Sequence, residues 1–572
     1  MKAICLWAQR GFQNSAALTL GVFVLSVTLM TVAPLPLHAQ SIPSDASGGC
    51  PIPSGTFNPW FQLGHPTLNG VVNPADSLNF PNIPNCTFYQ WSEQMFLWLT
   101  SPAPSVYGGG SHIFDSPTFY DVSPLDASGH RTLKKHVSGI FPLTVLRSNP
   151  AGPHGLPVIR VQGKLLEVEP TKLSAAGKPL VLNNLGKEVE IEKAEIRNNK
   201  VMFTSTAGKA IVAPKPIIRP QLKAIQAKTP AKPMFVQKFI INGHPIFLFP
   251  NGDLVPPEEG QATGDVLISQ QNSLVYYFSM VNDVYAYFLT GNKDHAFTQT
   301  QFPTTPANLA QVTTFASAHG VTFPDPNALA IEVKSSWVET TGLPNAGSYI
   351  TMTADVPVYN TANPNQWVPT GSTKHVTLAM VAMHVVGSTK GHPEMIWASF
   401  EHFNNTPNAA YSYTSTSGPK TVPQSTSGTW LFAANGAGLP FNVSHASVSG
   451  NDIVSVAPAT ISASNTLRNE PFGIAGSNAF SNTQIISANH SVLSQLTSGD
   501  LRANYYMLGA TWTPFGVPPT GGNGVGTNLL ANTTLETYAQ GTNCFTCHQG
   551  NMLGSGPDSG LSHIYFPIQP LF

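Results

Sequence analysis

The sequence predicts a mainly β protein with some α-helix, in an α+β arrangement. Charged residues are only 10 % of the 572, glycine and proline number 48 and 50, and short alternating apolar segments recur between turn sequences. A coiled coil, a helical bundle or a charged disordered chain would have fewer turn residues or more charge. Many short strands joined by turns fit this composition.

Residues 1–39 are predicted to be a signal peptide. Lys2 and Arg10 give a positively charged start, residues 16–33 are apolar and uncharged, and Ala39 ends a small-residue cleavage site. A retained anchor is the alternative, because about 18 apolar residues almost span a bilayer. No later segment is apolar enough to cross a membrane, so no transmembrane span is expected after cleavage. The prediction is a protein of a Gram-negative bacterium that is periplasmic or otherwise exported.

Residues 40–130 are predicted to form an N-terminal segment held by a disulfide. Cys50 and Cys86 are left as a pair, and an oxidising compartment favours their oxidation. Two buried free thiols are the alternative. A core helix is expected where apolar residues recur at helical spacing, namely at Trp91, Met95, Trp98 and Leu99.

Residues 131–238 are predicted to be a basic, hairpin-rich insertion. They contain 19 basic and 6 acidic residues, turn signals at residues 198–199, and a proline-rich linker from Pro214 to Pro233. Such a surface fits an acidic partner, or it is simply solvated. Aromatic residues for stacking on bases are few, so no binding of nucleic acid is expected.

Residues 239–515 are predicted to be the β-rich main body. A hairpin turn is expected at residues 242–243. Apolar spacing predicts helices over residues 274–288 and 484–506. Strands are predicted at residues 328–337, 349–358, 375–386 and 395–403.

Residues 516–572 are predicted to be a linker and a short helical attachment segment. Thr533 and Glu536 form a capping-box pattern, which predicts a helix reaching about Gln540. The sequence Cys544-Phe545-Thr546-Cys547-His548 follows, and it has the C-x-x-C-H spacing of covalent haem attachment. Two thiols about one turn apart can each form a thioether to a haem vinyl group, and the adjacent histidine can bind the iron.

Three other roles are open for Cys544 and Cys547. They could form a disulfide, a thioredoxin-like redox pair or half of a zinc site. A thioredoxin-like pair is expected near a βαβ pattern, whereas this pair lies close to the end of the sequence. Zinc would need further ligands, and no second cysteine cluster is present.

This motif resembles that of the c-type cytochromes. The resemblance implies one covalent haem c per chain, with Cys544 and Cys547 as attachment residues and His548 as an axial iron ligand. The chain departs from the small cytochrome c fold, because only 24 residues follow His548. The haem pocket is therefore expected to take its walls from upstream residues rather than from a standard small cytochrome c domain.

The second axial ligand is open. The candidates are His563, Met507, His490 and Met552. A methionine ligand would raise the reduction potential relative to a second histidine, and an open position would permit chemistry on a small ligand.

A second polar cluster lies on two predicted strands of the main body. Depending on the strand register, it could form a distal haem wall, a proton relay or a metal site, or remain a polar sheet edge. His384, Glu401 and His402 are the catalytic candidates. The full cluster is His384, His392, Glu394, Trp397, Glu401 and His402.

These observations favour an exported electron-transfer protein that works with a redox partner protein. One alternative is a haem-dependent oxidoreductase acting on a small substrate. Another is a non-enzymatic envelope-binding or structural protein with a Cys544–Cys547 disulfide. The oligomeric state is not predicted by the sequence.

Overall fold

The computed structural model describes most of the chain from residue 41 onward. It omits residues 1–40, 82–84, 125–129, 142, 144–157, 162–163, 198–199, 219–234, 242–243, 256–264, 435–439, 450–451, 457–459, 474–478, 521, 528, 531, 539, 542, 549–560, 563 and 566. The predicted signal peptide, most of the proline-rich linker, and the ligand candidates Met552 and His563 thus lie outside the described residues.

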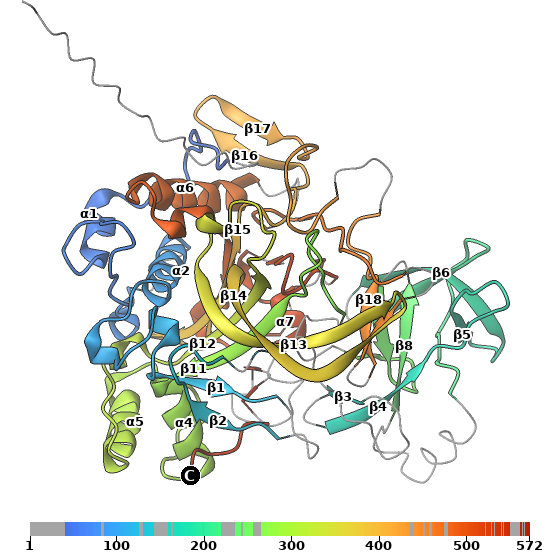
Figure 1. Cartoon of the computed structure of the whole chain (residues 1–572), viewed down its shortest axis with the longest axis horizontal. Helices are drawn as coiled ribbons and strands as arrows, with labels where there is room; N and C mark the ends of the chain where they lie inside the picture. The colour runs from blue at the N-terminus through green and yellow to red at the C-terminus, as the bar shows by residue number, and fades with distance from the viewer. Residues whose placement is uncertain are drawn as a thin grey trace, which may run out of the picture. The chain divides into compact units, whose positions relative to one another are not determined.

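Strands dominate the described residues, at 34 % against 20 % helix, which confirms a mainly β body. The largest sheet is antiparallel and has the strand order β2-β1-β11-β12-β14-β15-β20-β21, with β13 and β19 also pairing with β14 and β18 pairing with β19 (Figure 1). Its strands are β1 (Phe119–Val122), β2 (Leu133–Lys135), β11 (Tyr276–Asn282), β12 (Ile331–Glu339), β13 (Thr351–Asn363), β14 (Gln366–Thr389), β15 (His392–His402), β18 (Ala446–Ser449), β19 (Asp452–Ser455), β20 (Tyr505–Trp512) and β21 (Val525–Gly526).

One face of this sheet is apolar and packs against two helices, α2 (Cys86–Leu99) and α6 (Ala479–Gln495). Phe96 of α2 stacks on Phe400 of β15, with 4.3 Å between ring centroids. Asn489 of α6 exchanges two hydrogen bonds with the backbone of Met507 in β20. We call this side of the sheet the helix face.

The opposite face carries polar residues, because side chains alternate along each strand. Strand register places Glu332 and Lys334 of β12 beside Val386 and His384 of β14, and His384 beside Ser399 of β15. We call this side the polar face. It is contacted by α4 (Asp283–Lys293) and by the C-terminal residues, including the short helix α7 (Cys544–Cys547).

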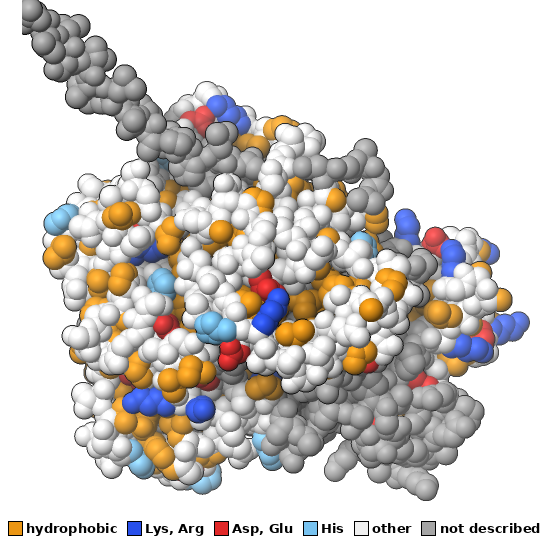
Figure 2. Space-filling model, in the orientation of Figure 1, with side chains coloured by type: hydrophobic (Ala, Val, Ile, Leu, Met, Phe, Trp, Pro, Cys, Tyr) orange, Lys and Arg blue, Asp and Glu red, His pale blue; other side chains and the backbone are white. Residues whose placement is uncertain are grey.

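Two further sheets contain strands of the basic insertion together with β9 and β10, which lie beyond its predicted end at Lys238. The predicted hairpins are confirmed by the pairing of β6 with β7 and of β8 with β9. Lysines such as Lys172 and Lys178 pair with glutamates of β6, and lysine and arginine side chains lie on the surface (Figure 2). The strands are β3 (Val158–Val161), β4 (Lys164–Pro170), β8 (Phe235–Ile241), β9 (His244–Leu248) and β10 (Leu254–Val255) in one sheet, and β5 (Leu180–Leu182), β6 (Glu188–Arg197) and β7 (Lys200–Ser205) in the other.

Two predicted helices are partly wrong. Residues 276–282 form strand β11, and α4 begins only at Asp283, where the Asn282 side chain caps it. Helix α6 ends at Gln495, and residues 505–512 form strand β20. Both strands lie inside the sheet and are buried on both faces, so they lack the alternation that marks a half-buried strand.

The four strands predicted in the main body are present as β12, β13, β14 and β15, with shifted ends. Two more helices complete the described set outside the short turns, α5 (Pro306–Ala318) and α1 (Ser54–Phe57), and a small hairpin is formed by β16 (Tyr411–Ser415) and β17 (Gly418–Val422). Across the described residues, the helices are too short or too polar to span a membrane.

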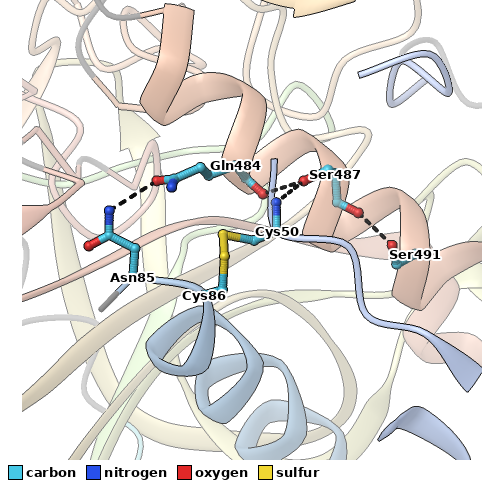
Figure 3. Close-up of a disulfide and its surroundings, with 6 residues drawn as sticks. All are labelled: Cys50, Asn85, Cys86, Gln484, Ser487 and Ser491. Carbon is cyan, nitrogen blue, oxygen red and sulfur yellow. Dashed lines mark hydrogen bonds between the residues drawn. A yellow bond between two sulfur atoms is a disulfide. The ribbon is translucent and has the colours of Figure 1, made fainter. Parts of the chain in front are cut away.

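The predicted Cys50–Cys86 disulfide is confirmed, with 5.1 Å between the Cα atoms. It joins the N-terminal segment to the first residue of α2 (Figure 3). The Cys50 amide donates to the Ser487 hydroxyl at 2.6 Å, and Asn85 donates to the Gln484 side chain. The disulfide joins α2 to the N-terminal segment, and these hydrogen bonds tie both to α6.

Candidate functional site

The Cys544–His548 motif begins with a single helical turn, α7. Asn543 caps this turn by accepting the Phe545 amide at 2.8 Å, and the His548 amide donates to the Cys544 carbonyl at 2.9 Å. Phe545 is fully buried in an apolar cluster with Leu561 and Tyr565. This burial anchors the turn, while Cys544 is only partly buried.

His548 is held by the backbone of the C-terminal tail, residues 561–572. Its Nδ1 lies 2.9 Å from the carbonyl oxygen of Leu561. Because a carbonyl oxygen only accepts, Nδ1 must be the protonated nitrogen. A neutral imidazole in this tautomer carries its lone pair on Nε2, which is a metal-binding atom.

Trp397 of β15 packs against His548 from the polar face. The ring centroids are 4.1 Å apart and the ring planes are inclined by 47°. The indole Nε1 donates to the Glu394 carbonyl at 3.0 Å, which fixes the orientation of the ring. The motif and the sheet therefore meet at this pair of rings.

The tail that holds His548 is itself tied down at several points. The Arg131 amide donates to the Pro567 carbonyl, and the Gln569 amide donates to the Arg131 carbonyl, both at 2.8 Å. Lys293 Nζ donates to the Tyr565 carbonyl at 2.9 Å. These bonds hold the tail against Arg131 and α4.

Residues 532–540, which we call the C-terminal strap, cross the polar face before the motif. Asn532 donates to Ser399 and to the Phe400 carbonyl, each at 3.1 Å. Thr534 shares a 2.7 Å hydrogen bond with Ser336 of β12. Polar contacts therefore dock the strap onto the sheet.

The predicted helix over residues 533–540 is wrong, because the described residues of the strap form turns. Asn532 takes the capping role instead of Thr533, since its side chain accepts the amides of Thr534 and Leu535. Glu536 accepts the Asn532 amide at 3.0 Å. The strap bonds to the sheet rather than continuing as a helix.

His384 pairs with the strap through Glu536, with 2.7 Å between Nε2 and Oε1. Burial raises the pKa of the Glu536 carboxyl, but the charge and hydrogen bond of His384 outweigh it and leave the pKa below its ordinary value. His384 and Trp397 are diagonal neighbours across β14 and β15, roughly 7–8 Å apart along the sheet. His384 thus lies on the same face as the motif.

Glu401 forms a buried ion pair with Arg468, and both side chains are shielded from solvent. Its other oxygen accepts the amide and the hydroxyl of Thr533 at the start of the strap. Arg468 also donates to Asn408. With both oxygens engaged, Glu401 anchors the strap.

His402 lies on the helix face, away from His384 and Glu401, because it is one residue out of phase with Glu401. Its ring stacks on Tyr349, with 3.7 Å between centroids, and Nδ1 accepts the Asn404 amide. His392 pairs with Glu394 at 2.8 Å, and both are buried. The six-residue cluster of the sequence is therefore divided among separate environments.

Two ligand candidates are placed by the structure. Met507 lies opposite Phe400 on the helix face, and His490 is on α6, which packs on that same face. His548 contacts Trp397 on the polar face. Neither Met507 nor His490 is brought to His548.

No family model, curated protein or solved structure matches this chain.

Several residues at the site were not indicated by the sequence. Leu561 acts through its backbone carbonyl, which leaves no mark in residue type. Glu332 lies in an alternating strand pattern that is typical of a solvent-facing side chain, and Arg468 lies in a loop. Trp397 belongs to the polar cluster in the sequence and Glu536 only to the predicted capping box, and their contacts with His548 and His384 depend on how the strap docks.

Proposed function

We propose that this chain is an exported monohaem protein resembling c-type cytochromes. Cys544 and Cys547 would attach one haem c, and His548 would be an axial ligand of its iron. When bound, the haem supplies one-electron exchange between Fe(III) and Fe(II). The observation that carries the proposal is the hydrogen bond from His548 Nδ1 to the Leu561 carbonyl.

This bond supports the proposal because a histidine that binds metal usually donates its other ring N–H to a backbone carbonyl or carboxylate. The bond fixes the tautomer and restrains rotation of the ring. The one-turn helix α7 adds the spacing that thioether attachment requires, with its first cysteine partly buried rather than enclosed. The residues present therefore fit the group that the motif implies.

The surroundings define what the protein contributes to such a site. Trp397 forms an aromatic wall against His548, and buried Phe545 holds the attachment turn. Because Met507 and His490 lie toward the helix face, we propose the second ligand, where one is present, among His563 and Met552. A redox partner protein would exchange electrons with this site.

Export is part of the proposal. The Cys50–Cys86 disulfide is compatible with an oxidising compartment, where such bonds persist. The charged N-terminus and apolar segment of residues 1–39 support secretion, and the proposed location is the periplasm.

The direct test is the mass of the denatured chain after expression in a host that matures c-type cytochromes. The wild type should carry one haem that survives denaturation. Cys544→Ala/Cys547→Ala should carry none, and His548→Gln should lose the spectrum of a histidine-ligated iron. His490→Gln is the matched histidine control and should keep both properties. Full haem content in the double cysteine variant would refute the proposal.

The His384–Glu536 pair favours a second candidate, a haem-dependent oxidoreductase. A paired histidine and carboxylate on the same face as the motif could move a proton to or from a small substrate. A high-spin ferric spectrum that changes on adding a small ligand would favour this function. A six-coordinate iron that binds no added ligand would favour electron transfer alone. A colourless protein would favour the binding or structural alternative with a Cys544–Cys547 disulfide.

A further inference from the structure

Glu332 of β12 is hydrogen-bonded to Ser562, the tail residue that follows Leu561 in the chain. The hydroxyl of Ser562 donates to Glu332 Oε2, and the hydroxyl of Tyr285 donates to Ser562 Oγ at 3.0 Å. Ser562 directly follows Leu561, whose carbonyl accepts from His548 Nδ1. Hydrogen bonds therefore run from Tyr285 through Ser562 to the Glu332 carboxyl, and Ser562 is the chain neighbour of the residue whose carbonyl holds His548.

The environment of Glu332 contains several charged and titratable groups. Lys334 lies two residues along the same strand, His384 lies on β14, and Arg131 approaches from the segment that pairs with the tail. Tyr285 faces it from α4 through Ser562. The Glu332 side chain is partly buried under the tail.

We propose that Glu332 binds a proton when the haem iron that His548 would ligate takes up an electron, so that electron transfer by this protein is coupled to proton uptake. This inference rests on the proposed function.

The coupling follows from charge. One electron comes from a one-electron donor, which is the redox partner in the cell or dithionite in a test. One proton comes from solvent water and forms an O–H bond on the Glu332 carboxylate, which becomes neutral. On oxidation the electron leaves and the proton returns to water. The extra negative charge of the reduced site favours the protonated carboxyl, because like charges disfavour ionisation.

The acidity of Glu332 matches this role. Burial raises the pKa of its carboxyl to about 7, against the hydrogen bond from Ser562 and the positive charges of Lys334, His384 and Arg131, which lower it. A group with this pKa changes protonation near neutral pH. The Ser562 hydroxyl donates to the ionised carboxylate, so this bond favours the ionised form and weakens when Glu332 is protonated.

The test is the midpoint potential of the haem-loaded protein measured between about pH 5 and pH 9. The reduced state binds the proton more tightly, so the potential falls as pH rises. Between the pKa values of Glu332 in the two redox states the slope approaches about 59 mV per pH unit, the one-electron equivalent of a tenfold change in proton concentration. Glu332→Gln should remove this slope.

Glu339→Gln is the matched control, because Glu339 is on the same strand and bonds to Tyr276 and Lys374. It should behave like the wild type. Redox-difference infrared spectra give a second readout, in which a protonated carboxyl band appears on reduction and is absent from Glu332→Gln. Should Glu332→Gln not fold, Ser562→Ala keeps the carboxyl and should move the sloping interval to higher pH.

Three outcomes would overturn the inference. They are a potential independent of pH in the wild type, an unchanged slope in Glu332→Gln, and a slope lost in His384→Gln but kept in Glu332→Gln. A chain without covalent haem refutes the proposed function itself, so the two failures are distinguishable.

Discussion

Trp397 and His548 lie ring to ring, 4.1 Å apart, although one belongs to strand β15 and the other to the C-terminal motif. The contact exists because the strap crosses the polar face and the tail returns to hold His548 through Leu561. An indole at this position is a reporter for whatever binds at His548.

Trp397 emission should be quenched when haem is attached, because energy transfer to a nearby haem is efficient. Trp397→Phe should therefore remove little fluorescence from loaded protein. The same substitution in the Cys544→Ala/Cys547→Ala background should remove more. Steady-state emission of the four proteins, at equal concentration, checks this. An equal loss in both backgrounds would place the haem away from Trp397.

The buried Glu401–Arg468 pair should be important for stability. Glu401→Gln leaves Arg468 as a buried charge without its partner, and breaking such a pair costs about 3–5 kcal/mol of unfolding free energy. The strap should also lose protection against amide hydrogen exchange, because Thr533 bonds to the same carboxylate. Denaturant unfolding and exchange measurements test both effects.

Glu339→Gln serves as the control for that substitution. Glu339 pairs with Lys374 near the surface, and glutamine can still accept the Tyr276 hydrogen bond. Glu339→Gln should therefore lower the free energy of unfolding by less than about 1 kcal/mol. Equal losses in the two variants would contradict the anchoring role of Glu401.

The His384–Glu536 pair should contribute stability that depends on acidity. The folded pKa of Glu536 is below its ordinary value of 4.5, so the contribution is present above that value and is lost as pH falls through the folded pKa. Glu536→Gln should lower the free energy of unfolding by about 1–3 kcal/mol near neutral pH. In acid, the variant and the wild type should have the same free energy of unfolding. Denaturant unfolding over this pH range measures both proteins. A difference in unfolding free energy between them that does not change with pH would contradict a contribution from the pair.

His136 offers an opposite pH signature. It lies between Asp115 and Asp121, at 3.1 and 2.9 Å, and all three are buried. Burial lowers the pKa of His136, but the two carboxylates outweigh it and raise the pKa to about 9. Its contribution is complete below the unfolded pKa of about 6.5 and is lost as pH rises through about 9.

The stability difference between wild type and His136→Gln should therefore shrink by about 3 kcal/mol between pH 6.5 and about pH 10. NMR titration of the His136 ring gives the pKa directly. A value near 6.5 would show that the two aspartates do not stabilise the charged imidazole.

Sequence patterns predicted the helices and strands whose formation depends on neighbouring residues. Helical spacing predicted α2, strand patterns predicted β12 to β15, and the Asn242-Gly243 pair predicted the antiparallel pairing of β8 with β9. Prediction failed at β11 and β20, because strands buried on both faces have the apolar density of a core helix. The helix predicted over the strap is wrong for a different reason. Glu536 bonds to His384, which is distant in the sequence, as well as to its own turn.

The site shows the same division. Spacing identified Cys544, Cys547 and His548, because attachment chemistry requires neighbouring residues in a fixed order. The contacts of His548 come from Leu561 and Trp397, and those depend on tertiary docking. Register also separated His402 from His384, since a shift of one residue moves a side chain to the other face of the sheet.

The central claim is that Cys544 and Cys547 hold a haem that His548 ligates. The most direct measurement is a pyridine haemochrome spectrum of the exported protein, produced alongside a control cytochrome in a host that matures c-type cytochromes. We expect a c-type spectrum at about one haem per chain. A colourless protein, in cells where the control cytochrome is loaded, would contradict it.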